Sequence, residues 1–224
     1  GVLQDLDRIG TLCKEHGALF HSDTVQTMCH YPFDLSKLPI DFVTCSAHKF
    51  HGPKGIGFLY IAEGLNVGGQ IEGGSQERAV RAGTESIHSI VGLAKAMEMA
   101  YHDLNEHERH IRALKAQMVT GLKSLFSDIR FNGNSDDSSR LYTVLNVSFP
   151  PHPKNGMALF LLDLEGVACS GGSACSSGAV LGSHVLRALQ FHDSERASLR
   201  FSFGRYTTEA DIDEALVAIE KVFA

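Results

Sequence analysis

Hydrophobic and polar residues alternate in a helix-then-strand rhythm along the first third of the chain. Apolar side chains recur at helical spacing on one face of the first segment, at Leu3, Leu6, Ile9, Leu12 and Cys13. Gly17 follows as a typical helix C-cap. Short apolar runs then predict three strands, over residues 18–22, 41–45 and 56–61. This order of elements indicates an α/β fold.

A glycine-rich stretch over residues 63–83 interrupts the rhythm, and its length is typical of a functional loop. Residues 85–126 predict one long helix or a broken pair, and we expect two domains to join there. Further strands are predicted over residues 129–132, 144–149, 167–170 and 198–203. Further helices are predicted over residues 156–164, 183–191 and 207–223.

Composition and charge exclude several classes of protein. The 224 residues suffice for one large domain or two modest ones. Lys plus Arg number 20 against 26 for Asp plus Glu, and a net charge of −6 without a basic block argues against a nucleic-acid binder. No apolar run approaches the roughly 20 residues of a membrane span, and no signal-peptide pattern opens the sequence, so we expect a soluble, cytoplasmic protein.

Cysteine usage and the first residues add two expectations. The five cysteines are an odd number with no repeating spacing, which argues against a secreted disulfide framework and leaves at least one candidate working thiol. The chain has no initiator Met and a helical pattern begins almost at once, so we expect a fragment of a longer protein.

Lys49 is the principal candidate for chemistry, because it lies in a turn between two strand-like runs. A lysine amine becomes nucleophilic where desolvation or positive charge lowers its pKa, as for an imine-forming lysine. Ser46 and His48 beside it can hold a phosphate. Asp23 and Gln26, after another apolar run, are the acid and amide that a pyridine ring needs at its nitrogen and phenolic oxygen. Pyridoxal phosphate is therefore the predicted cofactor.

Cys175 is the candidate working thiol. It lies among glycines and serines just after a predicted strand, where little burial anchors it and a loop can move. The alternative is a small apolar side chain packed at a strand end, and Cys169 keeps that interpretation. The spacing of the two thiols does not match zinc patterns, and no metal site is predicted.

Other polar residues keep two interpretations each. Arg200 lies inside an apolar strand and needs an anionic partner, either in a structural salt bridge or in a clamp on a substrate carboxylate. Thr84 lies at a predicted helix start, which is either an anion site or an ordinary cap. Asp23 alone is also compatible with a turn, and His21 with a buried core histidine. Three further histidines are expected on a solvated face: His102, His107 and His110.

Together these motifs resemble the pyridoxal-phosphate-dependent cysteine desulfurases of the NifS/IscS type, in the class V aminotransferase family. The resemblance rests on five motifs in the family's order, which start at residues 21, 46, 81, 173 and 199. It implies an aspartate-aminotransferase-like fold (fold type I) and a homodimer. Residues 1–95 would form the C-terminal part of the cofactor-binding large domain. Residues 96–224 would form the small domain with the cysteine loop.

The resemblance also implies roles for individual residues. Lys49 would hold the cofactor and remove the α-proton of L-cysteine, and His48 is also counted as catalytic. The implied cofactor contacts are Asp23 at the ring nitrogen, Gln26 at the phenolic oxygen, Ser46 and His48 at the phosphate, and Thr84 at the partner subunit's phosphate. Arg200 would bind the substrate carboxylate. Cys175 would take the sulfur as a persulfide and deliver it to a sulfur-acceptor or iron-sulfur scaffold protein, or to tRNA thiolation.

Departures from the family limit these implications. About the first two fifths of the family pattern is absent, including a histidine that stacks on the ring, so activity would require the missing N-terminal segment or a companion fragment. Cys169 is not expected in the family, which leaves a disulfide or a persulfide relay with Cys175 open. The alternatives are a selenocysteine lyase or another pyridoxal-phosphate aminotransferase, and a non-catalytic sulfur carrier in which Lys49 is structural.

Overall fold

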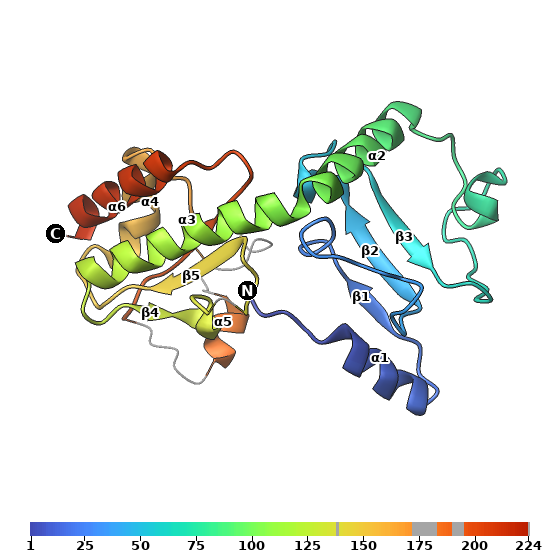
Figure 1. The fold of residues 1–224 in the computed structure, drawn as a ribbon, viewed down its shortest axis with the longest axis horizontal. Coiled ribbons are helices and arrows are strands. Elements are labelled where there is room, and N and C mark those ends of the chain that lie inside the picture. Colours follow the sequence, from blue (N-terminus) through green and yellow to red (C-terminus); the bar gives the residue numbers. More distant parts are fainter. Residues whose placement is uncertain (138, 172–182, 190–194, 224) are drawn as a thin grey trace. The chain divides into compact units, whose positions relative to one another are not determined.

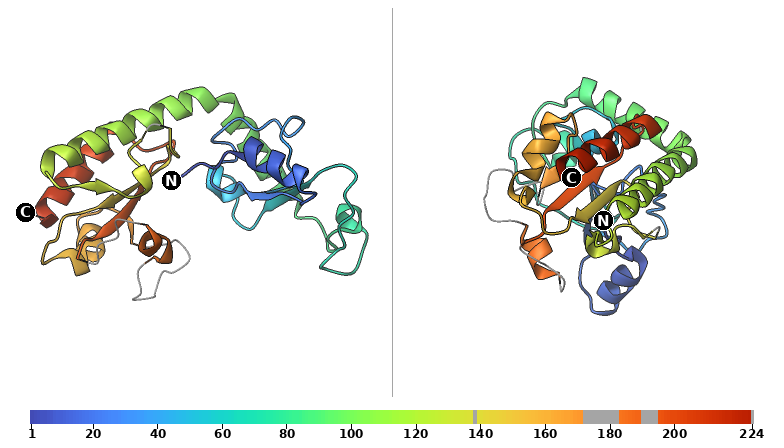
Figure 2. Two further views of the ribbon diagram at one scale, coloured as in Figure 1. Left: turned by 90° about the horizontal axis from the view of Figure 1, so that it is seen from below. Right: turned by 90° about the vertical axis from the view of Figure 1, so that its left-hand side faces the viewer.

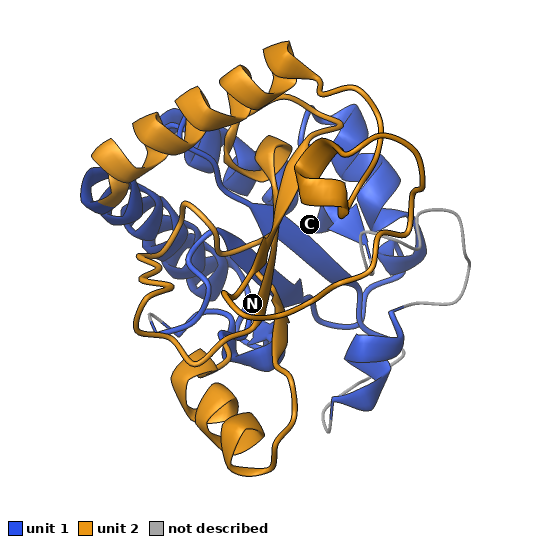
Figure 3. Cartoon of the chain, turned by 90° about the vertical axis from the view of Figure 1, so that its right-hand side faces the viewer, with its two compact units in different colours: residues 1–3, 105–224 blue, residues 4–104 orange. Residues whose placement is uncertain are grey.

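The chain folds into two compact units in a computed structural model that describes residues 1–137, 139–171, 183–189 and 195–223 (Figure 1). The N-terminal unit contains residues 4–104, and the C-terminal unit contains residues 1–3 and 105–224 (Figure 3). Among the described residues, no helix combines the length and the apolar character needed to cross a lipid bilayer.

A three-stranded sheet forms the centre of the N-terminal unit, in the order β1-β2-β3. Strand β1 (His21–Asp23) runs parallel to β2 (Phe42–Ser46), and β3 (Gly57–Ile61) is antiparallel to β2. Two α-helices accompany the sheet, α1 (Leu6–Glu15) and α2 (Ile87–His102). Two 3-10 helices complete the unit, η1 (Ala47–Phe50) directly after β2 and η2 (Gln76–Ala79) inside the glycine-rich stretch.

Alternation along β2 separates the two faces of this sheet. Val43 and Cys45 are buried, at 0% and 3% exposure, and belong to a core that includes Ala100 of α2. Side chains of a strand alternate between faces, so Thr44 and Ser46 lie on the face opposite to that core. Ser46, a predicted phosphate contact, therefore lies on the face of the sheet that is opposite to this core.

A four-stranded sheet, in the order β4-β5-β7-β6, forms the centre of the C-terminal unit. Every pairing in it is antiparallel. The strands are β4 (Arg130–Phe131), β5 (Val144–Ser148), β6 (Ser170–Gly171) and β7 (Ser198–Ser202). The helices are α3 (Leu104–Leu125), α4 (Ala158–Leu164), α5 (His184–Ala188) and α6 (Glu209–Phe223). Two short 3-10 helices complete the unit. They are η3 (Asn132–Asn134), directly after β4, and η4 (Asn155–Met157), directly before α4.

Helices α3 and α6 lie side by side in the C-terminal unit (Figures 1 and 2). Gly121 of α3 faces Leu216 of α6 so closely that an added Cβ would overlap the leucine side chain. Gln117 Nε2 donates a 2.7 Å hydrogen bond to Asp213 Oδ1 between the same helices. Phe223, the last residue of α6, stacks on Phe149 with ring centroids 4.6 Å apart. This aromatic contact joins the end of α6 to the segment after β5.

The predicted mixed α/β fold is confirmed, with shifts at particular boundaries. Residues 85–126 form the broken pair, α2 and α3, which are separated at Asp103. The strand predicted over residues 18–22 begins only at His21. The Ala18 amide donates a hydrogen bond to the Cys13 carbonyl and so still belongs to the end of α1. The strand predicted over residues 167–170 also begins later, at Ser170. The Val167 amide donates a hydrogen bond to the Leu162 carbonyl at the end of α4.

The solvated-face prediction for the three histidines is wrong in one case. His102 is exposed and His110 is half-buried, with its Nε2 2.8 Å from the Thr207 carbonyl oxygen, but His107 is only 8% exposed. His107 shares the helical spacing of Ile111, Leu114 and Met118, which are also buried on α3. Its charged neighbours in sequence lie on other faces of the helix, and this hid the apolar stripe.

Candidate functional site

Two parallel strands bring the predicted acid and the predicted lysine to one edge of the N-terminal sheet. Strand β1 ends at Asp23, which is the register partner of Thr44 in β2. Strand β2 continues to Ser46 and then directly into η1, which carries Lys49. The carboxyl ends of parallel strands meet at the same sheet edge, where open α/β sheets bind ligands.

Asp23 ends β1 with an exposed carboxylate that also shapes the following turn. Its Oδ1 accepts a 3.0 Å hydrogen bond from the Val25 amide, so the turn interpretation of this residue is confirmed. The next turn carries Gln26, also exposed, and is closed by a 2.9 Å hydrogen bond from the Thr27 amide to the Thr24 carbonyl. One short segment thus presents both the acid and the amide.

The Lys49 turn is held between two buried anchors. Ala47 and Phe50 are 0% and 3% exposed, whereas Lys49 is half-buried between them. The turn closes when the Gly52 amide donates a 2.9 Å hydrogen bond to the Ala47 carbonyl. His51 ends the turn at φ 66°, in the left-handed region.

Ser46 and His48 form a polar pair beside Lys49. Ser46 Oγ and His48 Nδ1 share a 3.0 Å hydrogen bond, and His48 is exposed. His21 belongs to the same polar face, because its Nε2 shares a 2.6 Å hydrogen bond with Thr44 Oγ1. His21 is exposed, so its interpretation as a buried core histidine is wrong. The face of the sheet that carries these polar side chains therefore lies outside the core.

His30 is a polar contact of this site that the sequence did not single out. It is 7% exposed, and its Nε2 lies 3.2 Å from the carbonyl oxygen of Lys49. Burial lowers its pKa most, the hydrogen bond to the Lys49 backbone raises it, and the charge of His51 lowers it. No periodicity marks a histidine that reaches a turn 19 residues away in the chain.

Arg200 lies in the middle of β7, opposite Asn146 on one side and Ser170 on the other. One of its terminal nitrogens donates a 3.4 Å hydrogen bond to Ser170 Oγ. Its Nε is buried without a hydrogen-bond partner, and no carboxylate pairs with it in the described part of the chain. The structural salt bridge expected as one alternative therefore has no partner among these residues. A buried guanidinium nitrogen without a partner leaves room for an anionic ligand, and the carboxylate-clamp interpretation of Arg200 stays a prediction.

Thr84 does not cap a helix as the sequence suggested. Helix α2 begins at Ile87 after Ser86, so Thr84 lies in the preceding segment with its side chain exposed. Arg81 nearby is already engaged, since one of its terminal nitrogens lies 2.8 Å from Glu85 Oε2. The predicted helix start at residue 85 was early by two residues, about half a turn, because Thr followed by Glu resembles an ordinary cap.

Burial makes three of the described cysteines, Cys29, Cys45 and Cys169, poor nucleophiles. Cys175 lies outside the described residues, and the four described cysteines are free thiols. Burial, together with the charge of Asp163, raises the pKa of Cys169 to about 11. Burial raises the pKa of Cys29 to about 12 and that of Cys45 to about 11. A thiol of that kind is almost entirely protonated at neutral pH, which weighs against Cys169 as a sulfur relay.

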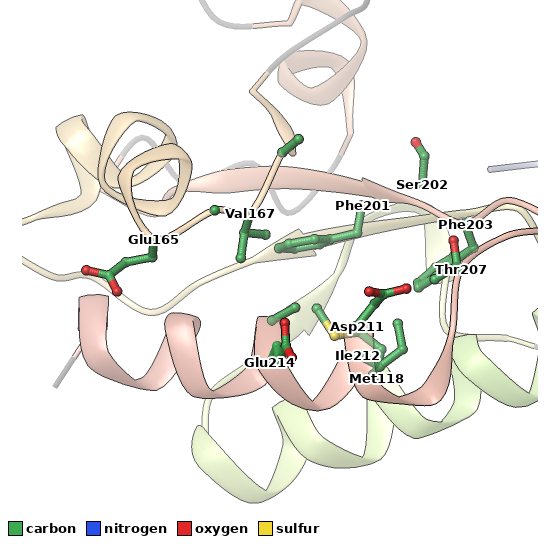
Figure 4. Close-up of a pocket in the computed structure, with 13 residues that line it drawn as sticks. Met118, Glu165, Val167, Phe201, Ser202, Phe203, Thr207, Asp211, Ile212 and Glu214 are labelled. Atoms are coloured by element: carbon green, nitrogen blue, oxygen red, sulfur yellow. The ribbon is translucent and has the colours of Figure 1, made fainter.

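A cavity of about 300 Å³ lies between β7 and α6 in the C-terminal unit. Figure 4 shows Phe201 and Ile212 beside the carboxylates of Asp211 and Glu214 along it. Asp211 already accepts a 2.8 Å hydrogen bond from the Thr208 amide. Among the predicted site residues that the structure describes, none lines this cavity.

The fold and the site define a class of protein. The pattern of the family described as "Aminotransferase class-V" matches residues 1–215, and the chain belongs to this family. Class-V aminotransferases and cysteine desulfurases depend on pyridoxal phosphate. The donor set at the sheet edge fits that group, because it offers an amine, a carboxylate and a hydroxyl–imidazole pair.

Within this family, the chain is similar to proteins named as cysteine desulfurases and to NifS-like proteins. The chain is 40% identical over 224 residues to a protein named cysteine desulfurase IscS from Clostridium botulinum (strain Hall). The matched region covers 99% of this chain and 56% of that relative. A solved NifS-like protein from Rickettsia africae matches with a TM-score of 0.88 and 29% identity, over 100% of this chain and 58% of that one. SspA in complex with cysteine matches with a TM-score of 0.71 and 29% identity, over 93% and 56%. The chain spans about half the length of these relatives.

Proposed function

We propose that this chain is the C-terminal part of a cysteine desulfurase that converts L-cysteine to L-alanine and takes the sulfur on Cys175. The observation that carries the proposal is the common sheet edge of Asp23 and the Lys49 turn, set by the parallel pairing of β1 and β2. The likeness to cysteine desulfurases supports it. In this proposal residues 1–95 belong to the cofactor-binding domain and residues 96–224 to the small domain.

Pyridoxal phosphate, when bound, supplies an aldehyde carbon that condenses with amines and a ring that accepts an electron pair. Lys49 provides the amine that holds it and then the base that takes the α-proton of the substrate. Asp23 keeps the ring nitrogen protonated, and Gln26 donates to the phenolic oxygen. The phosphate is bound by Ser46 and His48, with Thr84 of the partner subunit's chain completing the site across a homodimer.

The substrate carboxylate binds Arg200, whose buried Nε has no partner among the described residues. The Cys175 thiolate attacks the sulfur of L-cysteine, so that a sulfur–sulfur bond forms and the carbon–sulfur bond breaks. The departing carbon is protonated to the methyl group of alanine. Cysteine plus the Cys175 thiol thus yields alanine plus the Cys175 persulfide, and the atoms balance.

Delivery, partners and location complete the proposal. The persulfide sulfur passes to an acceptor or iron-sulfur scaffold protein, for cluster assembly or tRNA thiolation. The remaining length of the relatives, in the same chain or in a companion fragment, supplies the other cofactor contacts. A cytoplasmic location is part of this proposal, since an odd number of cysteines with no repeating spacing argues against a secreted disulfide framework.

A visible absorption spectrum of the purified protein, whole with any fragment that co-purifies, tests the proposal. Before and after addition of L-cysteine, the spectrum is recorded and alanine and sulfide are assayed in the same tube. We expect a yellow imine band that shifts with cysteine while alanine and sulfide appear together. A colourless protein that cannot be reconstituted with pyridoxal phosphate contradicts the enzyme and favours a sulfur carrier.

Two matched pairs of variants make this test specific. Lys49→Ala should abolish the imine band, whereas Lys54→Ala, which changes an exposed lysine of the same loop, should retain it. Cys175→Ala should abolish sulfide release, whereas Cys13→Ala should not. Full turnover of the Cys175→Ala protein with cysteine would instead indicate an aminotransferase, and a strong preference for selenocysteine would indicate a selenocysteine lyase.

A further inference from the structure

We infer that His30 is a positioning residue that holds the Lys49 turn in register with the segment carrying Asp23 and Gln26. The inference rests on the proposed function, in which these residues contact one cofactor. It adds a residue that the sequence motifs do not include. The hydrogen bond from His30 reaches the backbone carbonyl of Lys49 and not its amine, so His30 acts through the turn rather than on the reacting atoms.

The contact itself fixes which ring nitrogen acts. His30 Nε2 lies 3.2 Å from the Lys49 carbonyl oxygen, and a carbonyl oxygen can only accept. Nε2 therefore carries the hydrogen in this contact. The side chain is 7% exposed, so water does not compete freely for either group. A hydrogen bond in such surroundings is stronger than one at the surface, and leaving its acceptor unpaired is costly.

The chain before His30 is bent to reach this position. Cys29 is fully buried and has φ 63°, a left-handed conformation that is sterically unfavourable for a side chain with a Cβ. The His30 amide donates a 3.0 Å hydrogen bond to the Thr27 carbonyl within the same turn. Strained backbone persists where the surrounding contacts determine it, and here it directs the imidazole toward the Lys49 turn.

His30 forms the second of two links between the strand ends. At the start of the segment, Thr24 Oγ1 donates a 2.9 Å hydrogen bond to the Thr44 carbonyl in β2. At its end, His30 binds the turn that follows β2. Gln26 lies between these two links and Asp23 directly before them. The ring contacts and the lysine are therefore fixed relative to one another from both ends of one short segment.

The protonation preference of His30 suits this role. Burial lowers its pKa, and the charge of His51 acts in the same direction, so the neutral ring is favoured. A neutral imidazole keeps the Nε2 donor without adding a positive charge beside the Lys49 turn. The neutral donor fixes the turn and leaves the charge of the site to other residues.

Three variants of the full-length protein test the inference. His30→Leu removes the donor, and His30→Gln keeps an amide N–H near the place of Nε2. His102→Leu removes an exposed histidine of α2 as a control. Amide hydrogen exchange over residues 47–52 is measured without cofactor, and kcat and KM for L-cysteine are measured with it. Exchange reports local opening of the turn whether or not the protein has activity.

We expect His30→Leu to speed exchange over residues 47–52 about tenfold and to lower kcat by a similar factor, the effect of one lost hydrogen bond. KM should change little, since no substrate contact is lost. His30→Gln should restore both quantities, and His102→Leu should change neither. Unchanged exchange in the turn of a folded His30→Leu protein would overturn the inference, as would faster exchange spread evenly over the whole N-terminal unit.

A measurement on the unaltered protein covers the case in which His30→Leu does not fold. Nitrogen-15 labelling of histidine reports the ring tautomer, with the His30 signal assigned by its loss in His30→Gln. A hydrogen on Nε2 is expected, and a hydrogen on Nδ1 alone would contradict the contact. If the unaltered protein forms no imine with pyridoxal phosphate, the proposed function fails. The exchange and tautomer results then still decide whether His30 holds the turn.

Discussion

The buried hydroxyl of Thr24 donates a 2.9 Å hydrogen bond to the carbonyl oxygen of Thr44, and the Thr24 amide donates to the same oxygen over 3.2 Å. One acceptor in β2 thus receives two donors from the residue after β1. Thr24 is 0% exposed, so neither donor is available to water. This link fixes the spacing of the strand ends that present Asp23 and the Lys49 turn.

Thr24→Val should lower the free energy of unfolding by about 1 kcal/mol, because one buried hydrogen bond is lost while shape is kept. The Thr44 carbonyl keeps its bond to the Thr24 amide, so the loss is limited. Urea denaturation, with hydrogen exchange over β2 to identify the unit that opens, measures the change. Thr27→Val is the matched control, since its 3.3 Å bond is local. Equal losses in both variants would contradict the prediction.

Arg196 should contribute far more stability than its neighbour Arg130, although both pair with Asp128. The Arg196 side chain is 1% exposed and that of Arg130 is 49% exposed. Arg196 also donates to Ser148, through Nε to the hydroxyl over 3.0 Å and through a terminal nitrogen to the carbonyl over 2.9 Å. Removal of this side chain leaves buried acceptors unpaired.

Arg196→Met should therefore lower the free energy of unfolding by about 2–4 kcal/mol, as expected for several buried charged hydrogen bonds. Arg130→Met should change it by at most about 0.5 kcal/mol, because exposed ion pairs are weak. Thermal or urea unfolding of the two variants at equal protein concentration measures the difference. Similar values for both would show that burial of Arg196 does not matter.

The strand and helix types were predictable from the sequence because they depend on local periodicity. The alternation at Val43 and Cys45 and the apolar stripe of α3 are repeated signals within one element. Boundaries next to helix ends were less predictable. Gly17 and Gly166, at φ 64° and 84°, let the chain close its helices after they end, and the backbone amides used there delay the strands that follow.

The candidate site was predictable only as far as short motifs reach. The parallel pairing of β1 and β2 brings the motifs at Asp23 and Lys49 together. This was predictable because each motif directly follows a predicted strand. The Arg196 contact to Asp128 spans 68 residues, and the His30 contact to Lys49 spans 19. Such pairs depend on how separate elements pack, and no local pattern specifies them.

Arg200→Met should separate a ligand-binding role from a structural one. The Nε of Arg200 is buried without a partner among the described residues, so an apolar side chain of similar length should leave stability unchanged or slightly higher. Activity with L-cysteine should fall by about 10–100-fold in kcat/KM, the effect of lost charged hydrogen bonds to a carboxylate.

Arg187→Met is the control for Arg200→Met, because it changes an exposed arginine in α5. Steady-state kinetics and thermal unfolding are measured on the same preparations of both variants. A loss of stability in Arg200→Met that matches its loss of activity would support the structural salt bridge instead.

Stability of the N-terminal unit should fall as the pH decreases below about 6.5, the ordinary pKa of histidine. Burial lowers the pKa of His30 in the folded state, with an opposing effect of the Lys49 carbonyl and a supporting one of His51. The unfolded chain therefore binds this proton more readily, and protonation favours unfolding. The contribution is fully present above pH 6.5 and is lost as the pH falls through the folded pKa.

His30→Gln isolates this effect, because glutamine does not titrate. Urea midpoints at pH 7.5 and 5.5, with exchange over β2 to locate the opening, should differ for the unaltered protein and agree more closely for the variant. Asp34 does not interfere, because Lys37 and Ser36 lower its pKa to about 2 and its contribution changes only in stronger acid. Equal pH dependence in both proteins would mean that His30 binds its proton as readily in the folded as in the unfolded state. That result would contradict a buried, neutral His30 that donates to the Lys49 turn.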